Sequence, residues 1–176
     1  MTQTAAIATY GEVIEPNVLR IKRLLPGSIE RVWAYLTESD LRRQWLAAGD
    51  MELRQGAPME LVWRNDELEN AGQRPEGFDA EHRLQSEVTE VDPPHRLSYT
   101  FGNAGEVTFE LERAGDEVLL TLTHRRLPGR EMMTKVAAGW HAHLDVLEAK
   151  IAGQSPKAFW ANWASLKSDY EQRIPA

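Results

Sequence analysis

Apolar and polar residues alternate with a period of two along several short segments of this chain. In 17–25, Leu19 and Ile21 alternate with basic side chains, which is typical of a strand with one buried face. The same alternation runs through 106–112, and the glycine-containing turns 102–105 and 114–116 on either side of it indicate hairpins. Strands are therefore predicted at 17–25, 51–56, 58–64, 81–92, 95–101, 106–113 and 117–127.

Elsewhere the apolar residues recur every three or four positions, as on one face of a helix. Ser28 is a predicted N-cap for a helix with an apolar stripe formed by Ile29, Val32, Trp33 and Leu36. Leu41 and Trp45 indicate a second short helix. A long helix is predicted from about 131 to 152, ended by Gly153 as a C-cap.

One more helix is predicted after Gly153. Ser155 is its expected N-cap and Pro156 its first residue, since proline is well suited to the start of a helix. Its apolar stripe consists of Phe159, Trp160, Trp163, Leu166 and Tyr170.

The order of these elements predicts an α+β fold. Short links between consecutive strands imply an antiparallel meander of about six or seven strands, and a curved sheet of that kind must cover its apolar face. The helix at 131–152 is long enough to do so, with two short helices following the first strand. We therefore expect a tail at 1–16, a domain at 17–153 and an appended amphipathic helix at 154–176.

Composition excludes several classes of function. The chain has 20 Lys and Arg against 27 Asp and Glu, a net charge of −7, which argues against binding nucleic acid. It has no cysteine, so disulfides, thiolate zinc sites and cysteine nucleophiles are excluded. The N-terminal stretch lacks the pattern of a signal peptide, and no apolar run is long enough for a membrane span. A soluble, cytoplasmic protein without a cofactor is expected.

Three segments resemble a known family. "RLLPGSIERVWAYLTESDLRRQWL", "VTEVDPPHRLSYTF" and "LLTLTHRRLPGREMMTKVAAGWHAHLDVLEAKIAG" are similar, in this order, to segments of the SRPBCC or START-like superfamily. More narrowly, they resemble bacterial homologues of the heat-shock-protein-90 ATPase activator. The resemblance covers about 19–153 and implies a helix-grip fold, in which a curved sheet and a long helix enclose an apolar cavity. That fold is shared by lipid and steroid binders, polyketide cyclases and hormone receptors.

The stretch "GWHAHLDVL" places His141 and His143 two positions apart on the predicted long helix. At 100° per residue they lie about 200° apart, so they cannot bind one metal ion, which on a helix favours a spacing of four. His143 falls on the apolar stripe, and His141 on its outer flank. His143 is therefore either a core histidine hydrogen-bonded to a backbone carbonyl or a strand residue, a polar anchor for a ligand, or a general base.

The residues expected to line the cavity come from the strands and the long helix. On the strands, Trp63, Tyr99 and Phe101 lie on faces that alternate with polar positions, and the hydroxyl of Tyr99 is a candidate donor to a ligand. The complete predicted ligand-binding set is Trp63, Tyr99, Phe101, Met132, Met133, Val136, Trp140, His143 and Leu144. His124, at the end of the last strand, is expected to pack or form a hydrogen bond there, with a ligand role as the alternative.

No catalytic or metal-binding motif stands out in the sequence. The expected function is binding of a small hydrophobic or amphipathic molecule, lipid-like or aromatic and polycyclic, with the polar loop 65–79 as a gate. A cyclase or hydratase using the same pocket, and a chaperone- or stress-related interaction module, are the alternatives. Phe159, Trp160 and Trp163 either pack on the same chain or form a homodimer contact.

Overall fold

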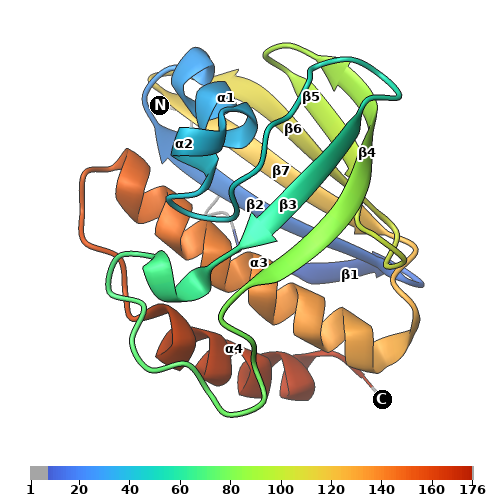
Figure 1. Cartoon of the computed structure of the whole chain (residues 1–176), viewed down its shortest axis with the longest axis vertical. Coiled ribbons are helices and arrows are strands. Elements are labelled where there is room, and N and C mark those ends of the chain that lie inside the picture. Colours follow the sequence, from blue (N-terminus) through green and yellow to red (C-terminus); the bar gives the residue numbers. More distant parts are fainter. Residues whose placement is uncertain (1–7, 176) are drawn as a thin grey trace, which may run out of the picture.

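Seven antiparallel strands form one curved sheet in the computed structural model, which describes residues 8–175 (Figure 1). The strands follow the order β1-β2-β7-β6-β5-β4-β3. Their bounds are β1 (Glu12–Glu15), β2 (Val18–Pro26), β3 (Pro58–Trp63), β4 (His82–Asp92), β5 (Arg96–Thr100), β6 (Glu106–Ala114) and β7 (Glu117–Arg125). From β3 to β7 each strand pairs with the next along the chain, and short turns connect the strands from β4 onward.

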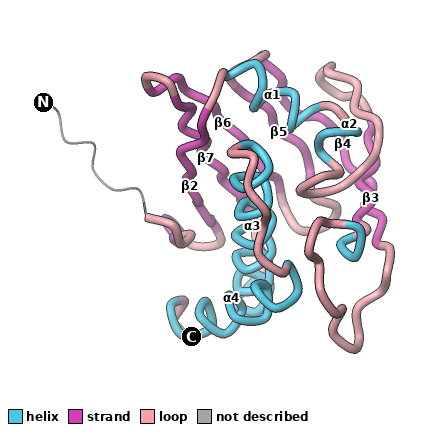
Figure 2. Tube along the Cα trace, turned by 90° about the vertical axis from the view of Figure 1, so that its left-hand side faces the viewer, coloured by secondary structure: helices cyan, strands magenta, loops and turns pink. Residues whose placement is uncertain are grey.

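Four α-helices and one short 3-10 helix complete the fold. They are α1 (Ile29–Thr37), α2 (Ser39–Arg42), η1 (Asn65–Glu67), α3 (Gly129–Ile151) and α4 (Phe159–Arg173). In Figure 1, α3 crosses the concave face of the sheet and α4 runs beside α3 on the side away from the sheet. The tube view in Figure 2 shows the same two layers, with α4 below α3. This arrangement confirms the predicted α+β helix-grip fold.

The core lies between the sheet and α3 because the predicted alternation holds along the strands. In β2, Leu19 and Ile21 are buried, while the residues between them are partly exposed. Val107, Phe109 and Leu111 of β6 are buried in the same way. Because side chains alternate between the two faces of a strand, one face of the sheet is apolar and packs against α3, as expected for a sheet covered on one side.

Three local predictions were wrong. The range 1–16 was predicted as a tail, but within its described part Glu12–Glu15 forms an edge strand on β2. The segment 51–56 was predicted as a strand, but it is a loop with a turn in which the Ala57 nitrogen donates to the Arg54 carbonyl. Both errors arise where few residues alternate, so the pattern carries little information.

The start of α4 is the third correction. Ser155 and Pro156 precede the helix, which begins at Phe159. The backbone N–H of Trp160, in the first turn, donates to the carbonyl of Ala71 at 3.0 Å. The Ala71 carbonyl therefore accepts a backbone N–H at the N-terminal end of α4, where a serine cap was predicted.

Candidate functional site

A cavity of about 860 Å³ lies between α3, α4 and the β3–β5 side of the sheet. Its volume is within the range of small-molecule sites in proteins. The residues that line it are Leu46, Trp63, Asn65, Gly77, Phe78, Asp79, Ala80, His82, Leu84, Phe101, Asn103, Ala104, Pro128, Met132, Lys135, Val136, Gly139, Trp140, His143, Phe159, Trp160 and Trp163. Apolar and aromatic side chains predominate in this wall.

One stripe of α3 forms the side of the cavity nearest the helix. The lining positions 132, 135, 136, 139, 140 and 143 recur every three or four residues, so they share one face of the helix. Gly139 sits in the middle of this stripe, and a methyl group added there would meet no other atom within 4 Å. The helix therefore leaves open space where most residues would place a side chain.

Aromatic rings from five separate parts of the chain meet around the cavity. Trp63 of β3 packs against Phe101, with ring centroids 5.7 Å apart. Phe101 in turn packs against Trp140 of α3 at 5.6 Å. On the other side, Phe78 of the loop before β4 contacts both Trp160 and Trp163 of α4, at 5.3 and 5.0 Å. Edge-to-face and tilted contacts of this kind hold the rings in defined orientations.

The loop that follows β3 is bonded directly to the beginning of α4. The indole N–H of Trp160 donates to a carboxylate oxygen of Asp66 at 2.9 Å, and the side-chain amide of Asn70 donates to the Pro156 carbonyl at 3.0 Å. Phe78, with 42% of its surface exposed, lies at the outer end of this loop. The loop 65–79, predicted as a gate, therefore lies beside the cavity and contributes to its wall.

His143 is buried in the wall of the cavity. Its Nδ1 lies 2.8 Å from the carbonyl oxygen of Trp45, and its ring packs against that of Phe159 in a tilted arrangement, with centroids 4.7 Å apart. Burial lowers the pKa of His143 to about 4, against an opposing effect of the hydrogen bond to Trp45. The ring is therefore neutral at pH 7. The predicted hydrogen bond to a backbone carbonyl is present, and the residue also faces the cavity.

His124 at the end of β7 has a different environment. Its Nε2 donates to the Ala104 carbonyl at 2.6 Å, and its Nδ1 accepts from the indole N–H of Trp140 at 3.0 Å. Both ring nitrogens are therefore occupied, and burial lowers the pKa of His124 to about 4. The structural role predicted for His124 is confirmed, because the residue fixes the orientation of Trp140 in the cavity wall.

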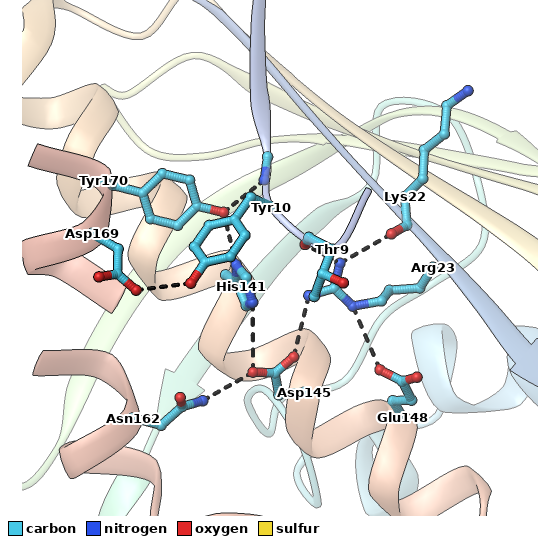
Figure 3. A network of polar contacts seen from close by, with 11 residues as sticks. Thr9, Tyr10, Lys22, Arg23, His141, Asp145, Glu148, Asn162, Asp169 and Tyr170 are labelled. Carbon is cyan, nitrogen blue, oxygen red and sulfur yellow. Dashed lines mark hydrogen bonds and ion pairs between the residues drawn. The ribbon is translucent and has the colours of Figure 1, made fainter. Parts of the chain in front are cut away.

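His141 faces the opposite side of α3, where α4 and the N-terminal segment cover it (Figure 3). Its Nδ1 lies 2.7 Å from the hydroxyl of Tyr170, and its Nε2 lies 3.7 Å from Asp145. Burial lowers the pKa of His141, although the carboxylate of Asp145 raises it in part. The outer flank of the helix is therefore not exposed, since α4 packs over it.

Comparison with known proteins gives a family-model match that covers most of the chain. Residues 26–152 match the family model of the activator of Hsp90 ATPase homolog 1-like protein. The chain belongs to this family. The match spans the sheet from the end of β2 onward and the whole of α3, and it confirms the predicted relationship to the SRPBCC superfamily.

Solved structures of similar fold extend the comparison. The protein encoded by gene BPP1335 of Bordetella parapertussis is 39% identical, with 100% of this chain and 97% of that chain covered and a TM-score of 0.81. CalU16 of Micromonospora echinospora is 19% identical, with coverage of 88% and 86% and a TM-score of 0.63. DynU16, from the dynemicin biosynthetic locus, is 20% identical, with coverage of 80% and 49% and a TM-score of 0.61. The last two share the fold alone. A comparison with curated proteins gave no match.

Most of the predicted ligand-binding residues of this family member meet at the cavity. The ones that line it are Trp63, Phe101, Met132, Val136, Trp140 and His143. Tyr99, Met133 and Leu144 are buried but do not line it. Tyr99 packs against Phe109 below the cavity wall, and burial raises the pKa of its hydroxyl.

Several lining residues were missed. Gly139 could have been found, because it shares the helical stripe of Val136 and His143. Phe78 gave no signal, because it lies in a polar loop without periodicity. Phe159 and Trp160, predicted as packing or dimer residues, are covered within the same chain and form the far wall.

Neither metal binding nor membrane insertion has support in the part of the chain that the structure describes. Residues 8–175 contain no group of three or more His, Asp or Glu placed to hold a metal ion. Within the same residues, no helix combines the length and the apolar character that crossing a membrane requires.

Proposed function

We propose that this family member binds a small apolar molecule with a flat aromatic ring system in the cavity between the sheet, α3 and α4. The observation that carries the proposal is the cavity of about 860 Å³ with rings on opposite sides: Trp63, Phe101 and Trp140 on one and Phe78, Phe159 and Trp160 on the other. Aromatic walls favour flat ligands, because offset-stacked and edge-to-face contacts add to the free energy of burying apolar surface.

The wall is held in place before any ligand arrives. The indole N–H groups of Trp140 and Trp160 are bonded to His124 and Asp66, so these rings have fixed orientations. Fixed rings lose little conformational entropy when a ligand binds, which favours affinity. The charged residues at the rim, Asp79 and Lys135, leave the interior apolar.

Binding has more support than catalysis in this cavity. A general base is commonly oriented by a third group, and a carboxylate would serve a histidine in that role. His143 is bonded to the backbone carbonyl of Trp45, which orients the ring but, unlike a carboxylate, carries no negative charge to stabilise its protonated form. Its low pKa also makes it a weak base. A polar anchor within an apolar site accounts for both properties.

The test uses Gly139, the open position on the α3 stripe. We expect polycyclic aromatic compounds to raise the melting temperature of the protein, since a ligand at 100 times its Kd adds about 2.7 kcal/mol of stability. Gly139→Phe places a ring in the cavity and should abolish this shift, whereas the matched control Gly139→Ala should keep it. A panel of fatty acids is run in parallel.

Two results would count against the proposal. A flat response to every aromatic compound would reject binding of this class, and stabilisation by fatty acids alone would assign the cavity to acyl chains. An unchanged shift in a folded Gly139→Phe protein would place the binding elsewhere on the molecule.

A further inference from the structure

We infer that the ligand presents a hydrogen-bond donor, a hydroxyl or amino group on its ring system, to Nε2 of His143. The inference rests on the proposed function, since it assumes that the cavity is the binding site. It specifies a polar group of the ligand, which the aromatic walls of the cavity do not determine.

The hydrogen bond of His143 determines which ring nitrogen carries the proton. A backbone carbonyl can only accept, so Nδ1, at 2.8 Å from the Trp45 oxygen, must be the donor. A neutral imidazole holds one N–H, and Nε2 therefore has a free lone pair. Burial lowers the pKa of the ring to about 4, so it is neutral at pH 7.

No donor among residues 8–175 reaches that lone pair. Nδ1 is the only atom of the His143 ring that forms a hydrogen bond within this part of the chain. The other two buried histidines differ. His124 uses both of its nitrogens, and His141 lies between Tyr170 and Asp145. His143 is thus the buried histidine that lines the cavity and keeps an unused acceptor.

A second acceptor in the same wall supports this assignment. The side-chain oxygen of Asn65 is buried and has no hydrogen-bond partner within the described residues. Asn65 opens η1 and lines the cavity together with His143. Buried polar atoms in native proteins nearly always have a partner, so an unpartnered atom in a cavity wall points to a group supplied from outside.

The unused acceptor of His143 makes the site selective. A ligand with a hydroxyl or amine donates a hydrogen bond to Nε2 of His143. A ligand that offers only ether or carbonyl oxygens places a second acceptor beside this lone pair and leaves it without a donor. The site should therefore distinguish phenols from their methyl ethers on an otherwise identical skeleton.

The experiment compares 2-naphthol, 2-methoxynaphthalene and naphthalene, titrated against the intrinsic tryptophan fluorescence of the full chain at pH 7. We expect 2-naphthol to bind about threefold to tenfold more tightly than the other two, the range expected for one net hydrogen bond. His143→Gln, whose amide can both donate to Trp45 and accept from the ligand, should keep the preference. His143→Leu should remove it.

A second readout does not depend on the variants folding. In long-range proton–nitrogen spectra of the wild-type protein, the Nε2 resonance of His143 should move upfield on binding 2-naphthol, because a hydrogen bond is formed to its lone pair. The Nδ1 resonance should stay in place, and naphthalene should move neither resonance.

The outcomes separate the two proposals. If all three compounds bind equally well, the donor inference is overturned and the proposed function stands. If the preference persists in a folded His143→Leu protein, His143 is not the acceptor and the assignment is overturned. If none of the three binds, the proposed function fails, and this inference fails with it.

Discussion

The hydroxyl of Tyr170 lies 2.7 Å from Nδ1 of His141, joining the end of α4 to the middle of α3. The same oxygen accepts the backbone N–H of Gly11 at 2.6 Å, so its own hydrogen is free to point at the histidine (Figure 3). One side chain thus links α3, α4 and the segment before β1. Because the first half of α4 forms a wall of the cavity, this contact also holds that wall in place.

Tyr170→Phe should lower the free energy of unfolding by about 1–3 kcal/mol, because it leaves the buried His141 ring and the Gly11 N–H without their partner. Urea denaturation of both proteins measures the difference. Tyr35→Phe is the matched control, since the Tyr35 hydroxyl forms no hydrogen bond within residues 8–175 and the residue is also buried. Equal losses in the two variants would show that the contact with His141 contributes nothing.

Stability should fall as the pH is lowered from about 6.5 towards 4. His124 and His143 have pKa values lowered to about 4 by burial, whereas the usual value is about 6.5. In that window the unfolded chain binds more protons than the native state, so protonation favours unfolding. Each histidine contributes up to about 1.4 kcal/mol per pH unit.

Urea denaturation at several pH values between 5 and 6.5 measures this slope. His143→Gln should reduce it by up to about 1.4 kcal/mol per pH unit, since one titrating group is removed. The same slope in the variant and the wild type would contradict the shifted pKa of His143.

Arg42 is expected to be essential for stability. Its buried guanidinium donates to the backbone carbonyls of Thr37, Ala47 and Gly49, so it holds together the segment that leads from α1 to β3. Arg42→Lys loses part of this fork and should cost about 2–4 kcal/mol of unfolding free energy. Arg43→Lys, at a half-exposed ion pair with Glu67, is the neighbouring control and should cost less than about 1 kcal/mol. Similar losses at both positions would refute this account.

Two glycines should respond in opposite ways to alanine. Gly139→Ala should stabilise the protein by about 0.5–1 kcal/mol, because Gly139 is helical and has free space around it. Gly105→Ala should destabilise it, because Gly105 has φ +80° and an added methyl group would collide with the Arg125 carbonyl. Thermal unfolding of the two variants is the measurement, and a destabilised Gly139→Ala would show that the cavity side of α3 is already filled.

Much of the fold could be predicted because its elements repeat a local pattern. The alternation around Phe109 and the stripe through Trp140 each extend over enough residues to define a buried face. The start of α4 was predicted wrongly because it depends on a partner distant in sequence. The Ala71 carbonyl accepts from the first turn of α4, whereas β1 pairs with its sequence neighbour β2 and was missed because four residues are too few to show an alternation. No local pattern around α4 contains the position of Ala71.

The candidate site was predictable to the extent that it lies on regular elements. Trp63, Val136 and His143 could be placed because strands and helices fix the direction of each side chain. Phe78 could not be placed, because the position of a long loop depends on what it packs against, here Trp160 and Trp163. For the same reason the stripe of α4 showed that its tryptophans would be covered, but not which surface would cover them.

The strand order has a consequence for how the chain folds. Strands β4 to β7 pair with sequence neighbours across short turns, so four strands can assemble at low entropic cost. Strand β2 pairs with β7, and Leu19 lies opposite His124. Strand β2 therefore cannot complete this pairing until the much later strand β7 is available. Closure of a loop of that length is slow relative to hairpin formation. During synthesis, β2 should therefore be the last long strand to join, and its apolar face should stay exposed until β7 has emerged.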